Sequence, residues 1–174
     1  MWAVRRHYMF AGLVRTLTLT FALVLASQTS GAEDAARSAF LGPAAELNGF
    51  LRQIHRFYTG CGERLGDVRG YLSKEQKWKE MHADAIRIDE VATKRVQSWM
   101  SDGQRDTVEV TNKSFDQAFR RTLRSSDDAQ VRKTCTSFIA NMEDEAWIEK
   151  WLRPLMDKVR KTESNLDAIK QGLQ

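Results

Sequence analysis

Proline and cysteine are both scarce in this chain of 174 residues, which contains two of each. Runs in which apolar and polar residues alternate are also nearly absent, and a half-buried β-strand requires such alternation. Apolar residues recur instead at spacings of three and four, as they do along one face of a helix. These patterns predict an all-α protein, an antiparallel bundle of four to five helices.

Short motifs that carry well-defined chemistry are missing as well. The sequence has no Cys-x-x-Cys pair, and its glycine-rich stretch "TGCGERLG" (59–66) lacks a Walker lysine and follows a predicted helix. A di-iron bundle needs Glu-x-x-His, but the residues three before His55 and His82 are Arg52 and Lys79. The sequence therefore predicts no catalytic residue, no metal site and no cofactor.

Acidic residues are absent from the start of the chain, where the first is Glu33. Three arginines precede an apolar stretch over residues 17–26, which would rise about 15 Å as a helix, half of what a bilayer core requires. Ser30 and Ala32 then place small side chains before a cut after Ala32. We predict that residues 1–32 are a cleaved secretory signal peptide. An uncleaved anchor is the alternative, and paired Arg5 and Arg6 leave open whether export uses the general or the twin-arginine route.

Export determines how the charge and the cysteines are interpreted. The chain has 27 Lys+Arg and 23 Asp+Glu, and the first 32 residues hold three and none, which leaves 24 against 23. This near balance gives no basis for nucleic-acid binding, and we expect no membrane insertion after cleavage. A periplasmic or secreted location is oxidising, so Cys61 and Cys135 are predicted to form one structural disulfide.

Residues 33–174 are predicted to form a single helical domain. The first helix is expected to begin near Pro43 and to end in the stretch 59–66. The second is expected to start at a capping box of Ser73 and Gln76 and to end at Gly103. A third would span residues 107–124, and the fourth would follow "SSDD" (125–128). The inner face of the fourth helix is predicted to be Val131, Cys135, Phe138, Ile139, Met142 and Ala146.

The last helix is predicted to follow a kink or restart at Pro154. From Leu155 to Leu173 its apolar residues alternate steps of four and three, which gives a narrow heptad seam. Two interpretations stay open. The seam packs on its own bundle, or it forms a homodimer or a groove for a partner helix.

Two surface clusters suggest protein binding. Trp147 and Trp151 lie four residues apart on one helical face in an acidic setting, and tryptophan and arginine dominate interface energetics. A second cluster contains Arg120, Arg121 and Arg124. The alternative for the tryptophans is that both rings cover the junction near Pro154.

These observations favour an exported protein that binds another envelope or secreted protein, as an adaptor, an inhibitor or an assembly factor. A second hypothesis is a small-ligand-binding protein or enzyme with a site between helices. Its pocket would be lined by Arg52, His55, Arg56 and His82. A third is a structural subunit that self-associates through Leu155–Leu173.

Overall fold

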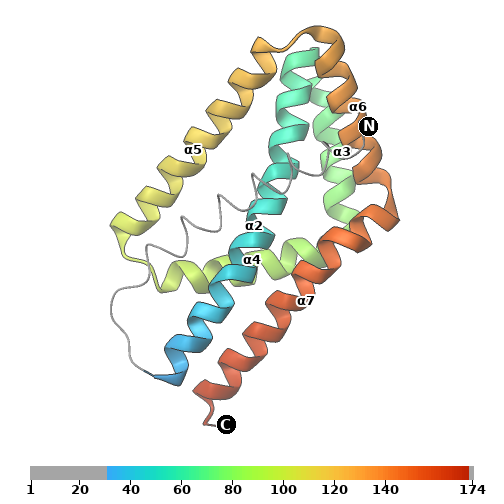
Figure 1. Ribbon diagram of the computed structural model, residues 1–174. Coiled ribbons are helices and arrows are strands. Elements are labelled where there is room, and N and C mark those ends of the chain that lie inside the picture. Colours follow the sequence, from blue (N-terminus) through green and yellow to red (C-terminus); the bar gives the residue numbers. More distant parts are fainter. Residues whose placement is uncertain (1–30, 173–174) are drawn as a thin grey trace, which may run out of the picture.

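The computed structural model describes residues 31–172, which form six helices and no strand (Figure 1). This confirms the all-α prediction, with slightly more helices than the four to five expected. The helices are α2 (Ala32–Leu65), α3 (Val68–Met81), α4 (Ala83–Ser98), α5 (Asp102–Ser125), α6 (Asp128–Glu143) and α7 (Glu145–Lys170).

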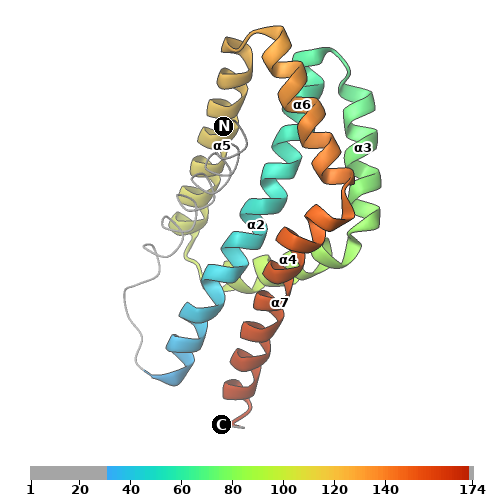
Figure 2. The same cartoon turned by 45° about the vertical axis from the view of Figure 1, so that its right-hand side comes forward.

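The long helix α2 is the centre of the molecule. Helices α6 and α7 follow each other along one side of it in the opposite direction, α3 runs antiparallel to its second half, and α4 crosses the bundle (Figures 1 and 2). The main core gathers apolar residues of α2, α3, α4, α6 and α7, among them Phe40, Leu47, Leu152 and Val159. Helix α5 contributes to a second, smaller core at one end, through Leu123.

Helix α2 is longer at both ends than its sequence pattern predicts. It begins at Ala32, so Pro43 lies in its interior rather than in its first turn. A proline there costs one backbone hydrogen bond. Phe40 and Leu47, on either side of it, are fully buried, and their packing offsets that cost.

The helix ends within the predicted stretch 59–66, but only at its far end, because it continues through Gly60 and Gly62 to Leu65. These glycines allow close packing. A Cβ on Gly60 would lie 2.7 Å from the Phe119 ring, and one on Gly62 would lie 3.0 Å from the Cα of Val68. Gly66 ends the helix, with a φ of 75° that favours glycine.

The second predicted helix is in fact two. Asp67, not Ser73, caps α3, and the chain breaks at His82 before α4 begins. Met81 is exposed, whereas Ala85, Ile88 and Ala92 of α4 are buried. The capping box that does form lies at α5, where Ser101 and Gln104 bond each other's backbone.

The fourth predicted helix is confirmed as α6, which Asp127 caps. Five of its six predicted inner residues are buried, but Ala146 belongs to α7 and is exposed. Helix α7 begins at Glu145 and passes through Pro154 without a restart. In the predicted seam, Val159 and Leu166 are fully buried within the bundle, and Leu173 lies outside the described residues.

No helix among residues 31–172 is both long and apolar enough to cross a membrane. The predicted signal peptide, residues 1–32, falls almost entirely outside this range and stays a prediction.

Candidate functional site

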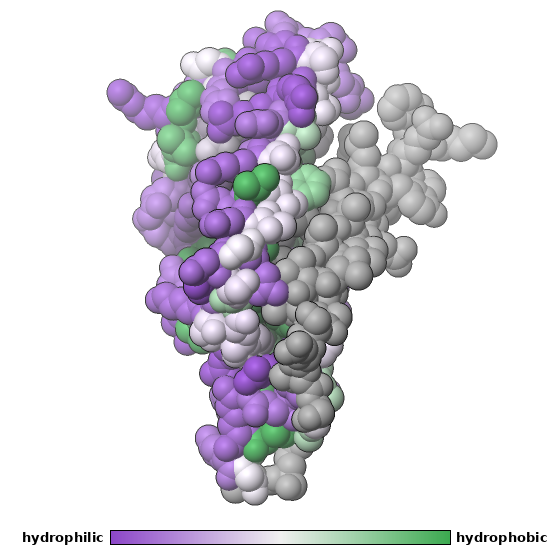
Figure 3. Space-filling view, turned by 90° about the vertical axis from the view of Figure 1, so that its left-hand side faces the viewer, coloured by the Kyte–Doolittle hydropathy of each residue, from purple (hydrophilic) through white to green (hydrophobic). Residues whose placement is uncertain are grey.

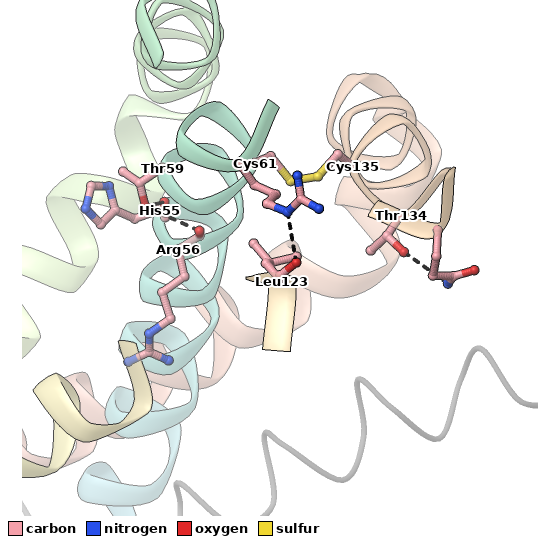
Figure 4. The surroundings of a disulfide bond; sticks show 9 residues. His55, Arg56, Thr59, Cys61, Leu123, Thr134 and Cys135 are labelled. Carbon is pink, nitrogen blue, oxygen red and sulfur yellow. Dashed lines mark hydrogen bonds between the residues drawn. A yellow bond between two sulfur atoms is a disulfide. The ribbon is translucent and has the colours of Figure 1, made fainter. Parts of the chain in front are cut away.

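The predicted disulfide is present between Cys61 near the end of α2 and Cys135 of α6, with 5.8 Å between their Cα atoms (Figure 4). Both cysteines are fully buried, and Leu123 and Val131 complete the small core around them. Cys61 was expected in a loop, but it lies on the last turns of a helix. The bond therefore joins two helices directly and fixes the top of the bundle.

The two tryptophans of α7 form one aromatic surface, in which Trp147 packs against the core and Trp151 is exposed to solvent. Their ring centroids are 6.2 Å apart, and Trp147 also stacks on Phe50 of α2 at 6.0 Å. Trp147 is half-buried by this contact, whereas Trp151 stays 43% exposed. The ammonium of Lys150 lies 5.6 Å from the Trp151 ring. We call Trp147 and Trp151 the tryptophan pair.

The arginine cluster lies apart from the tryptophan pair. Arg120, Arg121 and Arg124 are all exposed on α5, and Arg120 makes an ion pair with Glu63 at 3.2 Å. The cluster precedes α6 and the tryptophan pair follows it. Because the 16 residues of α6 rise about 24 Å, the two groups lie toward opposite ends of that helix. They therefore form two surfaces rather than one.

His55 takes part in a polar contact between α2 and α3. Its Nδ1 lies 2.8 Å from Oε1 of Glu75, and the Lys79 ammonium lies 2.6 Å from the same oxygen. His55 is 57% exposed, whereas Glu75 is 4% exposed. Glu75 and Lys79 have the i,i+4 spacing of an exposed ion pair, which makes the burial of Glu75 unexpected. It arises because α3 turns this position toward α2.

The pKa of Glu75 reflects two opposing causes. Burial raises the pKa of the carboxyl, but hydrogen bonds and charge from His55 and Lys79 outweigh it and hold the pKa below the ordinary value. The carboxylate is thus charged and doubly bonded at neutral pH. It orients the His55 ring while the rest of that ring faces solvent.

Arg56 points the other way from α2, toward α5 (Figure 4). It is 5% exposed, its Nε donates to the Asp116 carboxylate, and its guanidinium lies 5.8 Å from the Phe115 ring centre. Its Nη2 is buried and has no hydrogen-bond partner among the described residues. A buried guanidinium that is only partly paired is costly, and such a group calls for a physical explanation.

Arg52 and His82 are in different surroundings again. Arg52 is exposed and its Nε donates to Oδ1 of Asn48 at 3.0 Å, and Asn48 in turn donates to Asp89 of α4. His82 lies between α3 and α4 with its ring 4.6 Å from that of Trp78. Burial lowers the pKa of His82, although Glu149 and Glu145 of α7 act against this shift.

The four residues of the predicted pocket therefore belong to separate contacts. Arg56 faces α5, His55 faces α3, and His82 lies against Trp78 with the two rings tilted. The acids that pair with them, Glu75 and Asp116, were not identified from the sequence. They come from helices whose packing against α2 a single sequence does not specify. Within residues 31–172, no group of three His, Cys, Asp or Glu side chains could hold a metal ion.

Comparison with protein-family models, with curated proteins and with solved structures finds no match to this chain.

Proposed function

We propose that this protein is exported and acts by binding another envelope or secreted protein through the tryptophan pair. The observation that carries the proposal is the exposure of Trp151 beside a ring that the core holds in place. Large aromatic side chains that are fixed before binding lose little conformational entropy and supply much of an interface's energy.

The surroundings of the pair support the same function. Trp147 is held by Phe50, and one turn of helix separates it from Trp151, so the two rings form a continuous surface. Charged groups surround this surface, since Lys150 contacts the Trp151 ring and Arg153 pairs with Glu149 at 2.6 Å. An aromatic centre with a charged rim is the usual composition of a protein interface.

Photocrosslinking tests the binding surface directly. A photoreactive aromatic amino acid would replace Trp151 in the full-length protein, in the cells that make it. The matched control places it at Leu72 of α3, which is 42% exposed, almost the same as Trp151. We expect one reproducible adduct from position 151, identified by mass spectrometry, and none of the same identity from position 72.

The substitution Trp151→Ala should then abolish capture of that partner without unfolding the protein, as seen by circular dichroism. Because Trp147 packs on Phe50, Trp147→Ala also affects stability and is the poorer test. Identical adducts from positions 151 and 72 would contradict a specific surface. Adducts made only with the protein itself would favour the self-associating subunit.

Export needs its own measurement. We expect the exported protein to begin at Glu33, which intact mass and N-terminal sequencing would establish. The buried disulfide agrees with an oxidising compartment. A protein that keeps its first 32 residues and stays in the cytoplasm would overturn this part of the proposal.

A further inference from the structure

The charges around the tryptophan pair are divided between two flanks of α7. In the sequence the pair stands among acids, and Glu145 and Glu149 are each two residues from Trp147. Residues two apart in a helix point to nearly opposite sides, so these acids do not lie beside the pair. Both act on the pKa of His82, at the break between α3 and α4, and Glu149 makes its ion pair with Arg153. The acidic setting seen in the sequence therefore belongs to the opposite flank.

This opposite flank faces α3 and α4, and its charges hold α7 on the bundle. Arg160 pairs with Asp84 of α4 at 2.8 Å and with Asp157 at 3.6 Å. Asp167 pairs with Arg95 of α4 at 2.7 Å. Most acids of α7 are thus engaged on the side away from the tryptophan pair.

The flank of the tryptophan pair carries cations instead. From Trp147, a series of residues along α7 follows steps of four and three, which keep it on one side of the helix. We define the cationic stripe as Trp147, Trp151, Pro154, Lys158 and Lys161, together with Lys150 beside Trp151. All of these except Trp147 are exposed. The stripe extends about 21 Å along the helix.

The lysines of the stripe have few acidic partners. Lys150 and Lys161 make no ion pair within residues 31–172, and Lys158 reaches Glu46 of α2 only at 4.0 Å. The Lys150 ammonium instead lies 5.6 Å from the centre of the Trp151 ring. Complementary charge across an interface gives it specificity and speeds association. A surface with an aromatic centre and a cationic rim therefore favours a partner that carries carboxylates.

The arginine cluster on α5 is the other group of exposed cations. The visible part of the α5 face in Figure 3 is mostly hydrophilic, and its hydrophobic residues stand in isolated patches. Trp151 is the only exposed phenylalanine, tyrosine or tryptophan among residues 31–172. The cationic stripe therefore combines charge with an aromatic anchor, and the arginine cluster does not.

We propose that the cationic stripe binds a helical segment of the partner protein. Apolar residues of that segment would contact the tryptophan pair, and its aspartates or glutamates would lie against Lys150, Lys158 and Lys161. A helical segment fits because steps of four and three present a straight seam to another helix. The inference rests on the proposed function, since it names the chemistry of the partner that the tryptophan pair binds. The start of this chain does not fit the stripe, because residues 1–32 contain three arginines and no acid.

The test uses the full chain and three synthetic helical peptides of about 16 residues, long enough to follow the stripe. They share a seam of leucines and differ at three flanking positions, which are glutamate, glutamine or lysine. We expect the glutamate peptide to bind about tenfold more tightly than the glutamine peptide, and the lysine peptide to bind most weakly, in fluorescence anisotropy. The preference should shrink between about 50 mM and 500 mM salt, because the charges are exposed.

Lysine substitutions test whether the stripe is the binding surface. The double variant Lys158→Gln/Lys161→Gln should lose most of the preference for glutamate. Lys113→Gln is the matched control and should keep it, because Lys113 lies on α5 and is 68% exposed, close to the 61% of Lys158. Circular dichroism should show both variants folded. Equal binding of the three peptides, no binding of any, or an equal loss in variant and control would overturn the proposal.

The variant Trp151→Ala distinguishes failure of this inference from failure of the proposed function. It should weaken the binding of all three peptides and keep the ratio between the glutamate and glutamine peptides. Weaker binding in this variant, with equal binding of those two peptides to the wild type, would leave the tryptophan surface in place and reject the acidic partner. Unchanged binding in Trp151→Ala would reject the proposed function and this inference with it.

Two further outcomes would assign the stripe to another occupant and so overturn the proposal. Vesicles containing phosphatidylglycerol that displace the glutamate peptide would identify an anionic membrane surface. We expect no such displacement, because a helix that lies on a membrane needs a wider apolar face than this stripe has. A dimer of the full chain that Lys158→Gln/Lys161→Gln converts to a monomer, in light scattering, would identify a second copy.

Discussion

The two halves of α2 differ in how closely the other helices pack against their glycines. In the second half, Gly60 and Gly62 let α5 and α3 approach closely, and Cys61 is bonded to α6. In the first half, a Cβ on Gly42 or Gly49 would meet no atom within 4 Å in the described part of the chain. The same residue type thus serves tight packing at one end and leaves room at the other. One helix therefore has a clasped end, where Gly60 and Gly62 allow close packing, and a first half whose glycines lack such contacts among the described residues.

Removing the disulfide should cause the largest loss of stability, and this loss should fall on the clasped end of α2. The bond links residues 74 positions apart, and the chain-entropy model assigns such a loop about 4 kcal/mol of stabilisation. We expect the variant Cys61→Ala/Cys135→Ala to lose roughly that much unfolding free energy in urea denaturation. An unchanged denaturation midpoint would show that helix packing alone holds the clasped end.

Glycine substitutions compare the two halves directly. A methyl group on Gly60 would lie 2.7 and 2.9 Å from side-chain carbons of Phe119 and Leu123, so Gly60→Ala should cost about 1–3 kcal/mol. Gly49→Ala meets no such contact and should stabilise α2 by up to about 1 kcal/mol. Thermal unfolding of both variants measures the difference. Equal effects would mean that α5 covers the two positions alike.

Removing the carboxylate of Glu75 should have a smaller effect on stability than removing the disulfide, and this effect should depend on pH. Its pKa is below the ordinary value of 4.5, so its contribution to stability is full above about pH 5 and is lost as the pH falls through the folded-state pKa. Glu75→Gln should cost about 1–2 kcal/mol at neutral pH, and the gap to wild type should shrink below pH 4.5. A gap that is the same at pH 4 and pH 7 would contradict the assigned contacts with His55 and Lys79.

The sequence was sufficient for those features that depend on local pattern. Helical spacing predicted the all-α class and the inner face of α6, and the cysteine count predicted the disulfide. The sequence was not sufficient where packing between helices determines whether a segment stays helical. Gly60 and Gly62 have the appearance of a turn, but contacts with α5 and α3 keep them helical, and burial on both sides carries α2 through Pro43.

The candidate sites show the same difference between features set by local pattern and features set by packing between helices. The exposed position of Trp151 follows from its place beside the apolar face of α7. The partial pairing of Arg56 could not be foreseen, because it depends on how Asp116 and Phe115 of α5 are placed against α2. Likewise Glu75 resembles a surface partner of Lys79 until α3 is packed on α2. Single-helix patterns identify faces, and only the assembled bundle identifies which groups meet across them.

The bond between Cys61 and Cys135 has one more consequence, for proteolysis. It encloses α3, α4 and α5 in a single covalent ring, while α7 lies outside it. A protease that cuts once in the connection between α4 and α5 therefore releases no fragment, and electrophoresis without reductant would show one undivided band. Adding reductant would separate the two pieces. The protein can therefore be nicked within the ring while all six described helices, α7 among them, stay covalently joined.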